Sequence, residues 1–323
     1  MIPIFDLHQD LITVLRIQNF DPWSGQGTYA GHGNLQRLKQ SGYKLVVQAA
    51  FSLQRYWGEY LTENPVLQAL RAAERLHELV ETYPDQLMLV KNRHDLETLM
   101  QGDRLGFLLA YEGLYGVEDR WTLRALYRAG FRILGITWNV SNLVATGAWD
   151  SVDRGLSGLG RDLLQRADEL GFLLDLAHAS PKTYDEVLAL PLKRPPLVSH
   201  TGVLPEAPQT PRNISLERAR QVVQRGGIVG LALAKLFFED PNTTIEEVAG
   251  RVQLLLQEIP EGVASGSDFF GFGPRDTIEG LEGVEGLRNL EQVLRRQGVS
   301  EDALANYLYR NALRYLRAYL PEA

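Results

Sequence analysis

The sequence predicts an α/β protein with a (β/α)8 TIM-type barrel, formed by a single domain over residues 1–323. Eight short runs of β-branched and other apolar residues alternate with stretches whose apolar residues recur at helical spacing. No linker, low-complexity tract or internal repeat divides the chain. Because strands alternating with helices form right-handed crossovers, eight such units favour closure into a barrel. An open doubly wound sheet is the alternative, but no GxGxxG turn follows the first run.

The eight predicted strands are short and rich in valine, isoleucine, leucine and phenylalanine. They cover residues 2–7, 44–51, 105–111, 132–137, 172–177, 196–199, 227–233 and 262–267. The intervals between them are long enough for a helix, as a parallel sheet requires.

Residues 66–83 form the clearest predicted helix. Its apolar positions share one face and are Val66, Ala69, Leu70, Ala73, Leu76 and Val80. Its solvent face is expected to carry Gln68, Arg71, Glu74, Arg75 and Glu78. We therefore expect one side of this helix to pack against the sheet.

Other helices are predicted from their first residues. Ser180 places a capping hydroxyl before a proline at the first helical position. Ser215 and Ser300 precede first turns that contain acids, which the helix dipole favours there. Gly226 and Gly227 predict the end of the helix that begins after Ser215.

The composition excludes several classes of function. Hydrophobic residues make up 45% of the chain and charged residues 23%, a balance typical of a folded globular protein. The net charge of -7, without a compensating run of Lys and Arg, disfavours nucleic acid and anionic membranes as partners. No apolar stretch approaches the ~20 residues of a membrane span, and no signal-peptide layout is present, so we expect a cytoplasmic protein. Because the chain has no cysteine, any metal site must use His, Asp and Glu.

Side chains able to bind a metal or to carry a proton follow five of the predicted strands, where a barrel places its catalytic groups. The set comprises His8 and Asp10 after the first strand, Glu112 after the third, His178 after the fifth, His200 after the sixth and Asp268 after the eighth. A lone residue of this kind is usually structural, but coincidence at five strand ends is much less expected.

The first of these strands ends in the segment DLHQD. His8 and Asp10 are two residues apart, so in a strand they point the same way, whereas Leu7 and Gln9 point elsewhere. A nitrogen and an oxygen donor side by side suit a divalent metal.

The three remaining histidines serve as a comparison. His32, His77 and His94 do not close a predicted strand, and His77 lies on the helix 66–83. We interpret all three as structural or surface residues.

The number of donors indicates two metal ions. Three imidazoles, an Asp and a Glu exceed the three protein ligands of a mononuclear catalytic zinc site. Two ions ~3.5 to 4 Å apart, bridged by a carboxylate, would use all of them. Glu112 is the expected bridge, because each of its oxygens can hold one ion. His8 and Asp10 would then complete one site, and His178 and His200 the other.

The ordered motifs DLHQD, YEG, GLSGLGRDLLQRADELGFLLDLAHAS, PLVSHTG, PRNISLERA and GSDF resemble those of the membrane dipeptidase (renal dipeptidase) family of metallopeptidases. The likeness includes GHGNLQRLKQSGYKLVVQAAF early in the chain and LYRNALRYL near its end.

The resemblance implies a metal-dependent dipeptidase with two Zn²⁺ ions per chain, although other divalent metals could serve. The implied ligands are His8, Asp10, Glu112, His178 and His200. It also implies that Arg212 binds the substrate carboxylate and that Asp268 meets the free amino group or moves protons.

The implied reaction is hydrolysis of the peptide bond in short, unblocked dipeptides. A hydroxide held between two metals would attack the carbonyl, while Asp268 could pass a proton to the departing amine. Arg212 would recognise a carboxylate with two parallel donors, which Lys does less well. Without the resemblance, a surface salt bridge is an equal interpretation of Arg212.

Two positions depart from the family pattern. Trp138 stands where better-known members carry a histidine that supports the tetrahedral intermediate, and Trp cannot carry the charge of an imidazolium. Oxyanion stabilisation would then fall to zinc, to Asn139 or Asn142, or to a repositioned substrate. Trp138 itself either forms a wall of the substrate site or packs at the barrel mouth. Phe270 replaces the acid that usually follows Phe269 and so removes a negative charge.

Three functions remain open. The first is a zinc dipeptidase whose partner is a small peptide substrate. The second is a related dinuclear metal hydrolase that acts on another amide, a lactam or an ester, because the fold and the metals do not fix the substrate. The third is a binding protein with a decayed site, against which all five ligand positions are intact. The sequence leaves open whether the chain forms a homo-oligomer.

Overall fold

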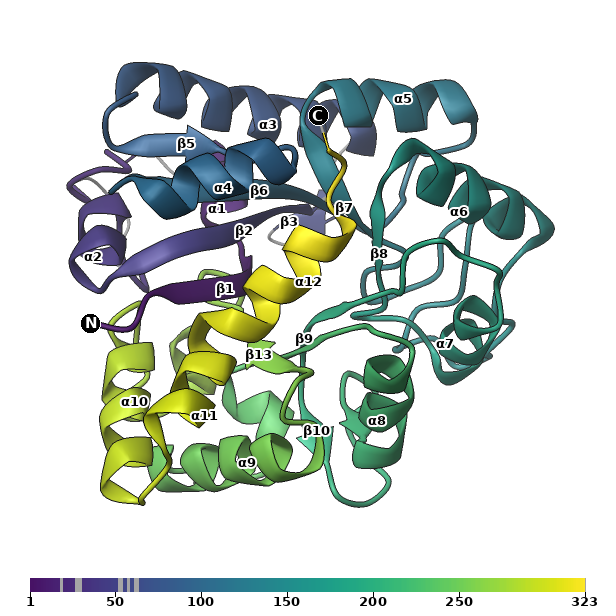
Figure 1. Cartoon of the computed structure of the whole chain (residues 1–323). Helices are drawn as coiled ribbons and strands as arrows, with labels where there is room; N and C mark the ends of the chain where they lie inside the picture. The colour runs from purple at the N-terminus through teal and green to yellow at the C-terminus, as the bar shows by residue number, and fades with distance from the viewer. Residues whose placement is uncertain (18–19, 27–30, 52–54, 57–58, 61–63, 323) are drawn as a thin grey trace.

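The barrel predicted from the sequence is confirmed by the structure, a computed structural model that describes residues 1–17, 20–26, 31–51, 55–56, 59–60 and 64–322 (Figure 1). Within these residues, eight parallel strands follow one another around a ring. They are β1 (Ile4–Gln9), β2 (Tyr43–Phe51), β6 (Leu105–Glu112), β7 (Phe131–Gly135), β8 (Leu173–Asp175), β9 (Val198–Thr201), β12 (Val229–Leu231) and β13 (Val263–Ser265). Each lies within two residues of a predicted run.

The ring closes between β8 and β9. A single parallel bridge pairs Asp175 with Leu197. The amide of Leu176 donates to the carbonyl of Leu197, and the amide of Leu197 donates to the carbonyl of Leu174, each over 2.9 Å. The alternative of an open sheet is therefore wrong.

Helices surround the ring on its outer side, except that the last helix, α12 (Asn311–Tyr319), lies across one end of the ring and packs on its interior residues (Figure 1). They are α1 (Leu11–Ile17), α2 (Leu35–Gln40), α3 (Pro65–Thr82), α4 (Arg93–Gln101), α5 (Arg120–Arg128), α6 (Gly158–Leu170), α7 (Pro181–Leu188), α8 (Leu216–Gln224), α9 (Ile245–Glu258), α10 (Gly286–Arg296), α11 (Glu301–Ala305) and α12 (Asn311–Tyr319). Short 3-10 turns η1 (Lys235–Phe238) and η2 (Pro274–Asp276), and the π-helical segment η3 (Asn306–Arg310), lie between them. None of the helices in the described ranges has both the length and the apolar character of a membrane span.

Several short strands were not predicted. The strand β5 (Leu87–Leu89) pairs with residues 105–107 of β6, and β7 pairs with residues 109–111 on the same strand. The pairs β3 (Arg55–Tyr56) with β4 (Glu59–Tyr60), and β10 (Val203–Leu204) with β11 (Ile214–Ser215), lie apart from the ring. Two or three residues are too few to give a periodic pattern in the sequence.

The predicted helix 66–83 is α3, but its buried face is rotated from the prediction. Gln68 was placed on the solvent face and is buried, together with Ala72 and Leu79. Gln68 stands four residues before Ala72, so it shares the face that continues through Ala72 and Leu76. The predicted caps are confirmed, because the side chains of Ser180, Ser215 and Ser300 each accept an amide hydrogen bond in the first turn.

The first strand departs from strict alternation. His8 and Asp10 point together, with Nε2 and Oδ2 3.5 Å apart, as predicted. Gln9 was expected to point elsewhere, and its amide donates to the buried carboxylate of Asp6 over 2.7 Å. The pairing of β1 with β2 shifts register between Asp6 and Gln9, and such a bulge turns a side chain out of the two-residue repeat.

Glycine is required where barrel strands approach closely. A Cβ at Gly230, in the middle of β12, would collide with the carbonyl oxygen of Ser199 on β9. By contrast, a Cβ at Gly250, inside α9, would meet no atom within 4 Å.

These two glycines provide a matched test of the packing. We expect Gly230→Ala to lower the free energy of unfolding by about 1–3 kcal/mol, because the added methyl group overpacks the barrel. We expect Gly250→Ala to raise it by about 0.5–1 kcal/mol, because Ala favours a helix interior over Gly. Urea unfolding of both variants checks the prediction. Equal effects of the two substitutions would contradict it.

Candidate metal centre and substrate pocket

The predicted metal-binding residues meet at one end of the barrel. His8 is the last residue but one of β1, Asp10 follows that strand, and Glu112 is the last residue of β6. His178 follows β8, and His200 lies in β9. All five side chains are buried, and each stands at the carboxyl end of its strand. Parallel strands of a barrel bring these ends together, which is why residues far apart in sequence become neighbours.

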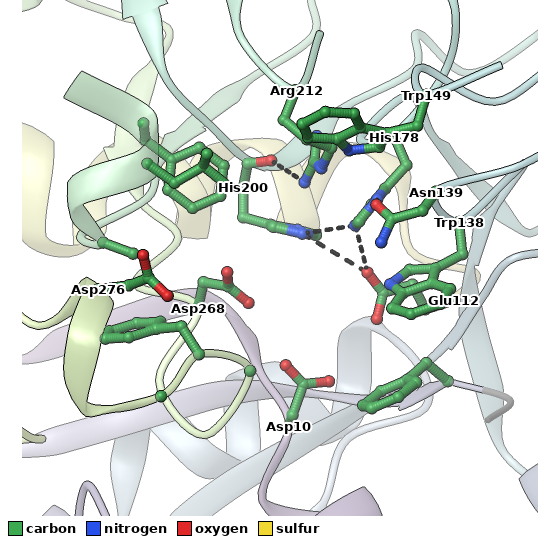
Figure 2. A pocket seen from close by; sticks show the side chains of 17 residues that line it. Asp10, Glu112, Trp138, Asn139, Trp149, His178, His200, Arg212, Asp268 and Asp276 are labelled. Atoms are coloured by element: carbon green, nitrogen blue, oxygen red, sulfur yellow. Dashed lines mark hydrogen bonds and ion pairs between the residues drawn. The ribbon is translucent and has the colours of Figure 1, made fainter. Parts of the chain in front are cut away.

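Glu112 lies between two groups of donors. Its Oε2 is 3.6 Å from Nε2 of His8. Its Oε1 is 2.8 Å from Nε2 of His178 and 3.5 Å from Nε2 of His200. Figure 2 shows the second group, in which both imidazoles face the Glu112 carboxylate. The two oxygens of one carboxylate therefore serve two different sets of nitrogen atoms.

Three overlapping sets of donor atoms are close enough to hold an ion, with all ligand atoms of a set within 4.8 Å of one another. They are His8 with Asp10 and Glu112, Glu112 with His178 and His200, and His8 with His200 and Asp268. The first two match the division predicted from the donor count.

Unpartnered atoms test whether a cation fits this centre. Nε2 of His8 and Oδ1 of Asp10 are buried without a hydrogen-bond partner. Nε2 of His178 and Nε2 of His200 are 3.1 Å apart. A buried polar atom without a partner costs free energy, and two imidazole lone pairs that face each other repel. A cation bound to these atoms would remove both costs, so the residues fit a metal.

The ionisation of the centre follows from its burial. Burial raises the pKa of Asp10 and of Glu112 to about 8. Burial also lowers the pKa of His178 and His200 well below the usual range, with nearby positive charge as a further cause. The imidazoles are therefore neutral and ready to bind, whereas the carboxyl groups hold protons that a cation must displace.

Hydrogen bonds orient the two imidazoles. Nδ1 of His178 is 2.9 Å from Oδ1 of Asn139, an acceptor, so Nδ1 carries the proton and Nε2 presents its lone pair. Nδ1 of His200 lies 2.8 Å from Oγ of Ser199. Asn139, predicted as a substrate contact, therefore also fixes the orientation of a candidate ligand.

The backbone is strained at two site residues. His178 and Asp268 have φ angles of 66° and 63°, in the left-handed region that non-glycine residues rarely adopt. Such strain gathers at functional sites, where the surrounding structure enforces it. Gly271 lies beside them, and a Cβ there would collide with the carboxylates of Asp10 and Asp268.

Arg212 is buried at the same end of the barrel, so the interpretation as a surface salt bridge is wrong. Its Nη2 donates to the carbonyl of His200 over 3.4 Å, and its own carbonyl accepts from Thr201. Its guanidinium lies 5.6 Å from the ring centroid of Phe237. Burial lowers the pKa of Arg212, although the carboxylates of Asp268 and Glu112 favour its charged form.

These groups open into a cavity of about 330 Å³. Its lining includes the predicted residues Asp10, Glu112, Trp138, Asn139, His178, His200, Arg212 and Asp268. His8 lies behind them and is not part of the cavity wall. Figure 2 shows Asp268 and Asp276 on one side of the cavity, across from Asn139 and Trp138.

The walls of the cavity were partly missed from the sequence. Trp149, Leu236, Phe237, Phe272 and Asp276 line it and were not predicted. They come from loops and short turns, where no periodic pattern marks a residue as facing a pocket. An aromatic or acidic residue soon after a strand end was the only available signal.

Trp138 forms a wall of the cavity and stacks on Phe51, with ring centroids 5.5 Å apart. Asn142, considered above as an oxyanion donor, does not line the cavity. Its amide donates to the carbonyl of Ile136, and its Oδ1 accepts from Val144 and Ala145. Phe270, at the second departure from the family pattern, is buried in the hydrophobic core.

The three comparison histidines take no part in the donor clusters of the described residues. His32 is buried, and its Nδ1 accepts from the amide of Phe270 over 2.8 Å. Nε2 of His77 is 2.9 Å from the carbonyl of Ala129, and His94 is exposed. Their interpretation as structural or surface residues agrees with these positions.

Comparison with known proteins agrees with the family resemblance of the sequence motifs. The family described as "Membrane dipeptidase (Peptidase family M19)" matches residues 1–320. The dipeptidase verJ of Clonostachys rogersoniana is 27% identical, over 98% of this chain and 84% of its own. The dipeptidase tcpJ of Claviceps purpurea is 26% identical, over 97% and 76%.

The fold is also found in a solved metallopeptidase from Rhodobacter sphaeroides, liganded with a phosphinate mimic of the dipeptide L-Ala-D-Ala. The TM-score is 0.85, with 22% identity over 98% of this chain and 99% of the other.

Metal binding should depend on pH. Because burial raises the pKa of Asp10 and Glu112 to about 8, both carry protons at lower pH, and a cation must release them. We expect the affinity for zinc to rise on the order of tenfold or more from about pH 6 to about pH 8, and to level off above that. Calorimetric titration against a competing chelator measures the affinity. An affinity that stays constant across this range would contradict the prediction.

Proposed function

The chain belongs to the membrane dipeptidase family, peptidase family M19, and from this premise we propose that it hydrolyses the peptide bond of short, unblocked dipeptides with two zinc ions. The observation that carries the proposal is the position of Glu112. Its two oxygens face separate nitrogen donors, as a carboxylate that bridges two ions must do. A single ion would leave one of these two groups of donors unused.

The residues that would hold the ions are His8, Asp10 and Glu112 for one, and Glu112, His178 and His200 for the other. Bound there, the ions would lower the pKa of water and polarise a carbonyl group, and so would supply a nucleophile to a chain that has no cysteine. Asn139 and Ser199 would keep the imidazoles of His178 and His200 in the binding orientation.

Arg212 is suited to bind the carboxyl end of the substrate. Its guanidinium lies in the cavity wall and is buried, so a carboxylate would reach it with little competition from water. In the described residues, no side-chain carboxylate forms an ion pair with it within 4 Å, and its donors remain available for substrate.

Asp268 is suited to meet the free amino group of the substrate and to exchange a proton with the amino group that leaves. Burial raises its pKa to about 7, with the negative charge of Asp10 as a further cause and with His8 and Arg212 opposing the rise. A group that titrates near neutral pH can both hold and release a proton, as general acid catalysis requires. Oδ1 of Asp268 is 3.7 Å from Nε2 of His8, so this carboxyl group adjoins the candidate centre.

Asn139 is suited to assist at the carbonyl oxygen, in place of the missing histidine. Its Oδ1 accepts from His178, which leaves the amide group to donate into the cavity that the residue lines. Trp138, stacked on Phe51, would form the adjoining wall against substrate side chains. The indole adds apolar surface there but no positive charge.

The size of the cavity supports a small substrate. About 330 Å³ accommodates a dipeptide rather than an extended chain. Arg212 and Asp268 would require a free carboxylate and a free amine at its two ends. The phosphinate dipeptide mimic bound by the related Rhodobacter sphaeroides enzyme supports the same substrate class.

Replacement of the bridging carboxylate tests the proposed centre. We expect Glu112→Gln to abolish dipeptide hydrolysis and to weaken metal retention, because the amide removes the charge shared by two ions. Metal content after dialysis and the rate of dipeptide hydrolysis are the two measurements. Full activity with two ions per chain would reject the bridging role.

Replacement of Arg212 tests the proposed carboxylate contact. We expect Arg212→Ala to raise KM for free dipeptides by about tenfold or more, because a charge-assisted hydrogen-bond pair is lost. Dipeptides amidated at the carboxyl end should be affected little, since they lack the charge that Arg212 recognises. Equal changes for free and amidated substrates would remove the proposed role.

A further inference from the structure

One acidic residue of the cavity has no role in the proposed reaction. Asp276 ends the 3-10 turn η2 and lines the cavity together with Asp268 and Phe272. Its backbone amide donates to the carbonyl of Gly273, which holds the turn. The residue is half-buried, and its side chain stands at the cavity beside Asp268 (Figure 2).

The carboxylate of Asp276 lacks a partner. Within the described ranges, no hydrogen bond and no ion pair joins it to another residue. This sets it apart from Asp150, an acid near the same mouth, which accepts hydrogen bonds from Ser141 and from the amide of Gly147. A half-buried anion without a partner is stabilised by whatever cation enters the cavity.

The charges of the cavity wall indicate what that cation is. Arg212 is the single Lys or Arg among the described lining residues, whereas Asp10, Glu112, Asp268 and Asp276 are acidic. The first two acids are proposed metal ligands, and Asp268 is proposed to act at the amino group. Asp276 alone is left without a positively charged counterpart.

The position of Asp276 indicates which part of the substrate would carry the positive charge. Figure 2 shows Asp276 on the Asp268 side of the cavity, across from Asn139 and Trp138. If Arg212 binds the carboxyl end and Asp268 meets the amino end, a group beside Asp268 lies next to the amino-terminal residue. The side chain of the substrate's amino-terminal residue would extend toward Asp276.

We propose that Asp276 selects dipeptides whose amino-terminal residue has a cationic side chain, lysine or arginine. The inference rests on the proposed dipeptidase function and adds the substrate class. The ammonium or guanidinium group would form an ion pair with the Asp276 carboxylate, while the apolar stem of the side chain packs beside Phe272. Asp276 acts on selectivity and takes no part in the bond cleavage.

Two dipeptides of matched length test the proposal. Lysyl-alanine and norleucyl-alanine share the same carbon stem, and only the first has an ammonium group. We expect the metal-loaded wild-type protein to favour lysyl-alanine by about tenfold in kcat/KM. Asp276→Asn should abolish this preference through a higher KM for lysyl-alanine, with a much smaller change for norleucyl-alanine. Circular dichroism and the metal content of the variant show separately that it folds.

A matched control removes the same charge elsewhere. Glu279 follows in the same loop, is exposed and does not line the cavity. Glu279→Gln should keep the preference for lysyl-alanine. An equal loss of preference in Glu279→Gln would show that overall charge, and not the position of Asp276, is responsible, and this would overturn the proposal.

A binding measurement distinguishes a failure of this inference from a failure of the proposed dipeptidase function. Phosphinate dipeptide mimics with a lysine or a norleucine side chain are titrated by calorimetry into wild type and Asp276→Asn. A preference for the lysine mimic that Asp276→Asn abolishes supports the inference even where dipeptides are not hydrolysed. No preference in the wild type, or one that Asp276→Asn retains, overturns it whether or not the protein is an active dipeptidase.

Discussion

The site depends on one electrostatic constraint, the burial of three carboxyl groups within reach of one another. Asp10, Glu112 and Asp268 occupy the same end of the barrel, where burial opposes their ionisation. Such a cluster is stable only when protons or cations neutralise it. Neutral imidazoles beside the carboxyl groups cannot supply the charge but can bind a cation that does. The strand ends of the barrel converge and so bring the carboxyl groups together. The carboxyl groups in turn favour the binding of cations at this end of the barrel.

The loops at this end of the barrel hold the cluster by local hydrogen bonds rather than by packing alone. The buried carboxylate of Asp6 accepts from the amide and the hydroxyl of Ser267, directly before the strained residue Asp268. Ser199 holds His200 in the same way, and Asn139 holds His178. Asp6 and Ser267, which do not line the cavity, thus hold the backbone next to the strained Asp268, whereas Asn139 holds His178 from the cavity wall.

The sequence predicted the barrel and the strand-end residues because both follow repeating rules. Each strand is an apolar run, and the residue after it reaches the same edge of the sheet. Gln68 was misplaced because a small rotation of a helix moves single side chains without changing the pattern. Trp149, Phe237 and Asp276 were missed for a related reason. Loop conformation decides whether they face the cavity, and it depends on contacts that no local pattern encodes.

The candidate metal centre spans the closure between β8 and β9 and therefore bears on the stability of the barrel. This joint has one backbone bridge, supported by the Asp175 carboxylate, which accepts from the amide of Ser199. The joint carries His178 on one side and His200 on the other. An ion bound to both imidazoles would link the ends of β8 and β9. Loss of that ion would therefore also weaken the closure of the barrel.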